Sequence, residues 1–201
     1  GAIFSGVAMV ITLTVPLRKA FGLEAYLTNK HYDAMAKLCL FTSMIVFYAY
    51  LSEFFMAWYS GEEVERATFW ARLFGPYWWA TWIMLVCNGM VPVMLWFKRI
   101  RYSIPALFAI SIFVNIGMWF ERYVIIATSL HHEYEPFAWG VYRPSLVEMG
   151  IVLGSFCWFG FWFLLFTRLL PPVAIAELKE VLPTPTRPRA AVGTGGQGGD
   201  Q

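Results

Sequence analysis

The chain has 201 residues, of which 59% are hydrophobic and only 14% are charged, and its formal net charge is +2. A soluble domain is about one-quarter charged, so this composition excludes an ordinary soluble protein and predicts an integral membrane protein. The small net charge gives no indication of nucleic-acid binding.

The apolar runs predict five membrane-spanning helices. The first, residues 2–17, is barely long enough to cross a bilayer, and the chain opens on Gly1 rather than methionine. We therefore expect helices upstream of this sequence, or a longer mature protein. Four longer runs each supply the about 20 apolar residues that a bilayer requires. They cover residues 34–58, 76–96, 104–130 and 145–170. The predicted fold is an all-α transmembrane helical bundle.

The distribution of lysine and arginine predicts the orientation. Basic residues gather after the first, third and fifth predicted spans, whereas the other two loops are rich in glutamate. Basic loops are retained in the cytoplasm, so we expect a cytoplasmic C-terminus. Residues 183–201 are rich in proline, glycine and threonine, and residues 171–201 are expected to form a cytoplasmic, largely disordered tail.

An ionisable pair, Glu121-Arg122, lies inside the fourth predicted span. Such residues are expensive in a membrane and usually mark a pathway, a ligand or a pairing partner. Helical spacing places Arg122 on one stripe with Asn115 and Trp119, and turns Glu121 about 100° away. The alternative is a charge pair that extends to the membrane surface. Further polar residues lie in other spans, namely Glu53, Asn88 and Glu148.

Pro92 is expected to kink the third span and to free a backbone carbonyl near Asn88. For Asn88 and Asn115, interhelical hydrogen bonds that serve packing alone are an equal alternative to a functional role.

The sequence offers no ligands for a haem, an iron–sulfur cluster or a metal. The histidines His31, His131 and His132 lie at or beyond the ends of spans, where they cannot ligate a buried haem. The cysteines Cys39, Cys87 and Cys157 stand singly in apolar runs, so none forms a metal-binding pair.

What remains suits an amphiphilic ligand with a polar head, such as a quinone, or a proton path. Quinol oxidation releases protons, so a carboxylate near the head group can accept them. We expect Glu53 and Glu121 to be the acceptors, with Arg122 holding a carboxylate or a quinone oxygen. Tyr59, Trp119 and Asn115 are the other predicted contacts of the quinone.

Several motifs in order resemble the polysulfide-reductase membrane-subunit (NrfD/PsrC-like) family over roughly residues 1–170. They are GAIFSG (1–6), HYDAMAK (31–37), YLSEFFMAWYSG (50–61), GPYWW (75–79), CN (87–88), VNIGMWFER (114–122) and TSLH (128–131). Within that family the chain is most similar to the C-type membrane component of the bacterial alternative complex III.

The resemblance implies a protein of two four-helix bundles, of which this chain is the C-terminal half: one four-helix bundle plus a terminal helix. It implies a bacterial inner-membrane subunit, not active alone, of a quinol:electron acceptor oxidoreductase that oxidises quinol or menaquinol near the periplasmic face. The implied partners are a periplasmic iron–sulfur subunit, multihaem cytochromes c, a homologous membrane subunit and lipids. We expect the loop from His131 to Tyr142 to contact the iron–sulfur subunit.

Two alternatives follow from the same resemblance and composition. The family's main quinone-contacting residues lie in the first bundle, so the chain is either one wall of a quinone site or a structural or proton-conducting anchor that binds no quinone, as in the homologous F-type component of the same complex. A transporter would show paired broken helices and inverted repeats, and neither is visible.

Overall fold

The structure, a computed structural model, describes residues 1–131, 140 and 142–170, and within them the chain forms helices and no strand. The chain divides into two units, residues 1–142 and 143–201, which are described separately. The disordered tail predicted for residues 171–201 lies outside the described residues, as does most of the loop expected to contact an iron–sulfur subunit.

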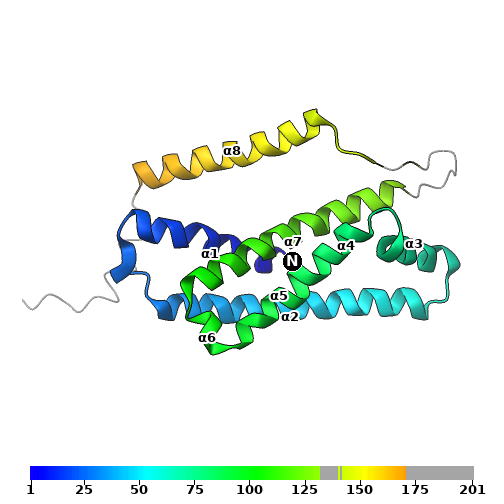
Figure 1. The fold of residues 1–201 in the computed structure, drawn as a ribbon, viewed down its shortest axis with the longest axis horizontal. Coiled ribbons are helices and arrows are strands. Elements are labelled where there is room, and N and C mark those ends of the chain that lie inside the picture. The colour runs from blue at the N-terminus through cyan, green and yellow to red at the C-terminus, as the bar shows by residue number, and fades with distance from the viewer. Residues whose placement is uncertain (132–139, 141, 171–201) are drawn as a thin grey trace, which may run out of the picture. The chain divides into compact units, whose positions relative to one another are not determined.

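Five helical segments are long and apolar enough to cross a membrane, which confirms the predicted fold class. They are α1 (Ala2–Ala20), α2 (Asn29–Tyr59), the third span (Trp78–Trp96), α7 (Ile104–His131) and α8 (Leu146–Leu169) (Figure 1). The third span is composed of α4 (Trp78–Leu85), η2 (Val86–Met90), α5 (Val91–Val93) and η3 (Met94–Trp96).

The helix α2 begins five residues before the predicted position 34, because a cap forms further upstream. Thr28 has extended backbone, and its N–H donates to Nδ1 of His31 at 3.3 Å. The side chain of Thr28 in turn accepts from the backbone N–H of His31, which completes a capping box. The two bonds satisfy N–H groups that the start of a helix leaves without partners.

Three short helices connect the spans. They are η1 (Leu23–Ala25), α3 (Glu63–Phe74) and α6 (Lys98–Arg101). The helix α3 occupies a region that the sequence assigns to a polar loop. Acidic residues in its first turn and Arg72 in its last turn complement the helix dipole.

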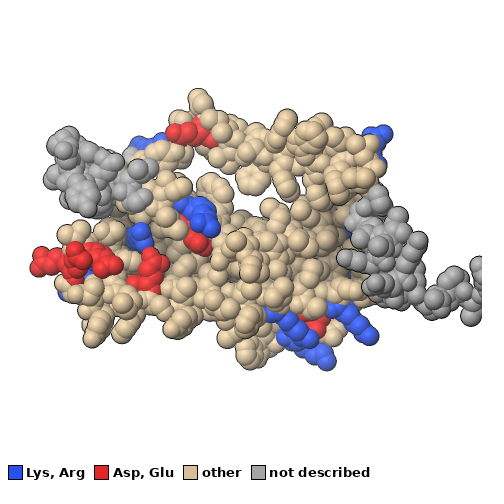
Figure 2. All heavy atoms as spheres, turned by 180° about the vertical axis from the view of Figure 1, so that it is seen from behind, with Lys and Arg blue, Asp and Glu red and all other residues tan. Residues whose placement is uncertain are grey.

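In the first unit the four spans form a bundle in which each span runs antiparallel to the one before it (Figure 1). The helix α1 packs against α2 and α7, and the third span also packs against α2 and α7. We call the end that carries α3 the α3 end, and the end that carries α6 the α6 end. Figure 2 shows acidic side chains gathered at the α3 end and basic ones at the α6 end, with a mostly uncharged band between.

Buried positions recur every seventh residue along two of the helices, the spacing of helices that pack side by side. In α2 they are Ala36, Ser43, Tyr50 and Ala57. In α7 they are Leu107, Val114 and Thr128, with the half-buried Glu121 completing the series. Many of these residues are small, which lets helices approach closely in a membrane.

A π-helical turn, η2, interrupts the third span just before Pro92. Proline has no N–H, so it leaves without its usual partner the carbonyl four residues earlier, that of Asn88. The hydroxyl of Ser43 in α2 donates to that carbonyl at 3.0 Å. The freed group predicted near Asn88 therefore bonds to a neighbouring helix.

Two glycines let other helices contact this turn. A Cβ built on Gly117 of α7 would lie 2.3 Å from Oδ1 of Asn88 and 2.7 Å from Cβ of Cys87. A Cβ built on Gly89 would lie 2.5 Å from the ring of Phe47. No side chain fits at either place without moving its neighbours.

At the α6 end, Asp33 of α2 joins two basic residues. Its Oδ1 accepts from Nε of Arg101 at 2.9 Å, and its Oδ2 lies 2.6 Å from Nζ of Lys37. Arg101 also donates to the carbonyls of Leu95 and Trp96, where the third span ends. The side chains of Asp33 and Arg101 are only 11% and 16% exposed, whereas that of Lys37 is 59% exposed.

We expect Asp33→Asn to lower the free energy of unfolding by roughly 1.5–3 kcal/mol, the range for hydrogen bonds to charged groups. The matched control, Lys37→Gln, removes only an exposed pair and should change stability by less than about 0.5 kcal/mol. Thermal unfolding in detergent measures both. Equal effects of the two variants would contradict a specific role for the Asp33–Arg101 contact.

The second unit contains α8, which begins with a capping box. Glu148 accepts from the N–H of Ser145 at 2.8 Å, and the Ser145 hydroxyl accepts from the N–H of Glu148 at 3.3 Å. The presence of Glu148 near the end of an apolar span is thus explained by helix capping.

Candidate functional site

Three ionisable side chains, those of Glu53, Arg72 and Glu121, gather around one small cavity near the α3 end. The cavity has a volume of about 40 Å³ and is lined by α2, α3, α4 and α7. Its lining residues are Tyr50, Glu53, Phe54, Phe69, Arg72, Thr81, Met84, Glu121, Val124 and Ile125.

Glu121 is held on one side of the cavity by two donors from two other helices. The hydroxyl of Tyr50 donates to Oε2 of Glu121. The amide of Asn88 donates to Oη of Tyr50 at 3.1 Å and lies 3.5 Å from the same carboxylate oxygen. Asn88 is fully buried and Tyr50 is 8% exposed. These donors offset part of the cost of placing a carboxylate in an apolar bundle.

Glu53 is held on the other side by Arg72 of α3. Nη1 of Arg72 lies 3.2 Å from Oε1 of Glu53, and its Nε donates to the hydroxyl of Thr128 in α7 at 3.1 Å. The guanidinium also lies 4.9 Å from the ring centre of Phe69. Arg72 thus fixes α3 to α2 and to α7 through charge-assisted bonds. The side chain of Glu53 is 54% exposed, so its carboxylate can be reached from outside the bundle.

The wall of the cavity contains a buried polar atom, the hydroxyl oxygen of Thr81, without a partner among the residues that the structure describes. The hydroxyl of Thr81 is 1% exposed as a residue and makes no hydrogen bond within the described part of the chain. A buried hydroxyl is normally satisfied, by protein or by water. A water requires roughly 10–15 Å³ of cavity volume, so a cavity of about 40 Å³ has room for a few waters beside Thr81. A quinone ring is several times larger than a water and does not fit inside it.

The structure brings together two of the predicted site residues, Glu53 and Glu121, which line the same cavity. Four others lie elsewhere. Arg122 is exposed, and its Nη2 would lie 3.9 Å from a Cβ on Gly1. Asn115 donates to the hydroxyl of Thr12 in α1 at 2.9 Å, a packing contact between helices.

The predicted aromatic contacts lie on the surface of the first unit. Tyr59 is 72% exposed and stacks on Phe55 with ring centres 5.8 Å apart. Trp119 is 45% exposed and stacks on Tyr123 at 6.0 Å. Neither residue lines the cavity.

Sequence reasoning missed Arg72, Tyr50 and Thr81. The sequence places Arg72 in a loop between two predicted spans, because α3 is too polar to resemble a membrane-spanning helix. Tyr50 carries a usable signal, since it lies seven residues after Ser43 and three before Glu53, on one face of a helix. Nothing in the local sequence distinguishes Thr81 from an ordinary packing residue.

Among the residues that the structure describes, no group of three or more histidine, cysteine, aspartate or glutamate side chains converges as a metal site would require.

Comparison with known proteins identifies the bundle. The family model "Polysulphide reductase, NrfD" matches residues 1–132, which is the stretch from α1 through α7. The chain belongs to the NrfD family. It is therefore a multi-pass membrane subunit of the kind that serves respiratory oxidoreductase complexes. No curated protein matches the chain significantly.

NrfD-family membrane anchors generally bind quinone and associate with iron–sulfur subunits of reductase complexes. The match places the whole polar cavity inside the family region, whereas α8 lies beyond it.

Proposed function

We propose that this NrfD-family chain belongs to a quinol-oxidising complex of the alternative complex III type, and that its bundle accepts protons released near the outer membrane face. The observation that carries the proposal is a cavity lined by carboxylates from two helices, Glu53 and Glu121, and by Thr81, whose buried hydroxyl has no partner within the described part of the chain.

Quinol oxidation needs an acceptor for electrons and an acceptor for protons. Oxidation of a quinol to a quinone releases two electrons and two protons. The electrons pass to the iron–sulfur partner, so this chain needs to supply only groups that hold protons. A general base must lie within hydrogen-bond reach of the proton that it takes, either directly or through one water. The cavity has the volume for such a water beside Thr81.

The residues divide this work. Glu53, the more exposed carboxylate, is the entry acceptor, and Arg72 takes the holding role predicted for Arg122. Glu121 is the inner acceptor, positioned by Tyr50 and Asn88. The predicted contacts Arg122, Tyr59, Trp119 and Asn115 are not part of this path.

The orientation used here, with the α3 end facing outward and the C-terminus in the cytoplasm of a bacterial inner membrane, rests on the positive-inside rule. The basic side chains of the loops between α1 and α2 and between the third span and α7 lie together at the α6 end.

A second function is favoured by the size of the cavity. Its volume of about 40 Å³ suits water alone, as expected of a proton-conducting anchor that binds no quinone. In that case the carboxylates would carry protons without taking them from quinol.

Glu53→Gln tests the proposal. The amide keeps the shape of the side chain but cannot accept a proton, so we expect quinol oxidation by the assembled complex to fall at least about tenfold, or about 1.4 kcal/mol in barrier. Glu63→Gln, on α3 but outside the cavity, is the matched control and should keep its rate within about twofold. The rate is measured with quinol and the complex's own acceptor.

Two results would count against the proposal. Unchanged quinol oxidation in both Glu53→Gln and Glu121→Gln would remove the proton-accepting role. Unchanged oxidation combined with lost proton movement in proteoliposomes would establish the second function instead.

A further inference from the structure

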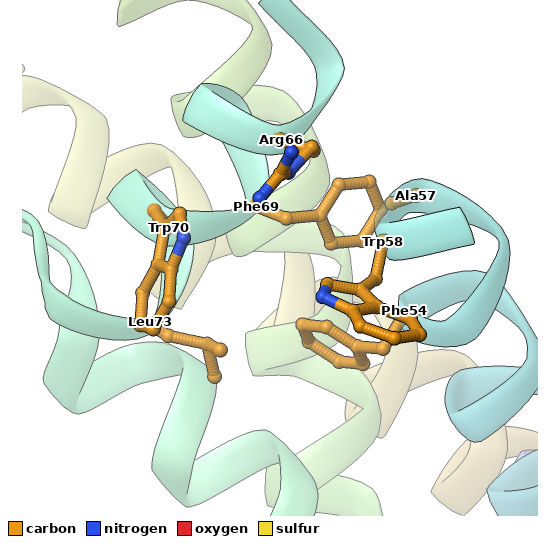
Figure 3. A pocket seen from close by; sticks show the side chains of 7 residues that line it. All are labelled: Phe54, Ala57, Trp58, Arg66, Phe69, Trp70 and Leu73. Atoms are coloured by element: carbon orange, nitrogen blue, oxygen red, sulfur yellow. The ribbon is translucent and has the colours of Figure 1, made fainter. Parts of the chain in front are cut away.

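A second hollow lies beside the polar cavity and differs from it in size and chemistry. It is a groove of about 190 Å³ between the end of α2 and the helix α3. Figure 3 shows its lining side chains, with Phe54, Trp58 and Phe69 on one side and Trp70 and Leu73 on the other. Ala57 and Arg66 complete the lining.

The groove and the cavity share a wall. Phe54 and Phe69 line both, and their rings meet edge to face with centres 5.2 Å apart. On one side of this aromatic pair lies the apolar groove, and on the other side lie Glu53, Glu121 and Thr81. A ligand in the groove is therefore one side chain away from the proposed proton acceptors.

We propose that this groove binds the ring of a quinol. The inference rests on the proposed function and names the place where its substrate sits. Flat aromatic walls favour an aromatic ring, because stacked and edge-to-face contacts add to apolar burial. Sites for whole drug-sized ligands measure about 300–1,000 Å³, so the groove suits the ring alone and leaves the isoprenoid tail among the lipids.

The one charged residue of the groove fits the same ligand. Arg66 makes no ion pair within the described residues, although Glu62, Glu63 and Glu65 lie close to it in sequence. Its guanidinium provides donors for one ring oxygen.

Photoaffinity labelling of the intact complex in membranes tests the inference without relying on turnover. An azidoquinone is irradiated, and the labelled peptide is located by mass spectrometry. We expect the label within residues 54–73 and its loss on competition with excess unlabelled quinol. Labelling of these residues that is competed by phospholipid but not by quinol would show an acyl chain in the groove and overturn the inference.

Filling the groove provides the variant. Leu73→Trp adds bulk inside it, and we expect at least about tenfold less labelling, or about 1.4 kcal/mol of lost binding. Leu73→Phe is a milder filling that covers the case in which the tryptophan prevents assembly, and it should reduce labelling in proportion. Val64→Trp is the matched control, because Val64 is 74% exposed on the same helix and does not line the groove. Equal labelling of all three variants would overturn the inference.

The inference and the proposed function fail separately. If the label maps outside residues 54–73 while the Glu53 and Glu121 variants lose turnover, the groove is excluded and the proton acceptors stand. If the label maps to the groove while those variants turn over normally, the groove binds quinol and the proposed acceptors are wrong.

Discussion

Gly117→Ala should strongly destabilise the contact between α7 and η2. The new Cβ would lie 2.3 Å from Oδ1 of Asn88 and 2.7 Å from Cβ of Cys87. The atom Oδ1 belongs to a fully buried amide that bonds to Tyr50, so it cannot turn aside without losing that bond. We expect a loss of roughly 3 kcal/mol, the upper part of the range for overpacking. Thermal unfolding in detergent measures it.

Gly6→Ala is the matched control, because Gly6 lies in α1 and a Cβ there meets nothing within 4 Å. A helical glycine gives up stability relative to alanine, so this variant should gain about 0.5–1 kcal/mol. Gly117→Ala should also lower quinol oxidation, because a displaced Asn88 no longer positions Tyr50 and Glu121. A stable and active Gly117→Ala protein would show that α7 and η2 are not in close contact.

Glu121→Gln is expected to have the largest effect on activity. Glutamine keeps the size of the side chain and can accept from Tyr50, but it cannot hold a transferred proton. General-base groups contribute about 10²–10⁴-fold to rates, so quinol oxidation by the assembled complex should fall by about that factor. Recovery of the iron–sulfur partner with the purified variant shows whether assembly is intact.

Tyr50→Phe separates positioning from proton transfer. It removes one donor to Glu121 and leaves the carboxylate, so the rate should fall only about tenfold. Tyr123→Phe, on α7 but outside the cavity, should leave the rate unchanged. Wild-type turnover in Glu121→Gln, with full assembly, would exclude Glu121 as an acceptor.

The spans were predictable because long apolar runs in a membrane have one solution, a helix that satisfies its own backbone. The freed carbonyl near Asn88 was predictable for a similar reason, since a proline always removes one backbone donor. The helix α3 was not, because its dense charges resemble a loop and its position depends on contacts with α2, α4 and α7.

The candidate site was predictable only in part. The cost of burying a carboxylate marked Glu53 and Glu121, whichever partners they have. The sequence also associates Arg122 with the site, because Arg122 is next to Glu121. In the structure Arg72 takes that place, brought to Glu53 by a turn of chain whose path local sequence does not determine. Partner identity depends on tertiary packing, and no periodicity records it.

The bond between the Ser43 hydroxyl and the Asn88 carbonyl has a consequence for how this bundle can be recombined. One span completes its backbone pairing only with a side chain from another, and an unsatisfied backbone group in hydrocarbon costs several kcal/mol. A chimera that exchanges α2 alone for a sequence without a hydroxyl at position 43 would leave the Asn88 carbonyl without this hydrogen-bond donor. An exchange of residues 29–96 keeps donor and acceptor together, so the hairpin of two spans, rather than the single helix, is the smallest transferable piece.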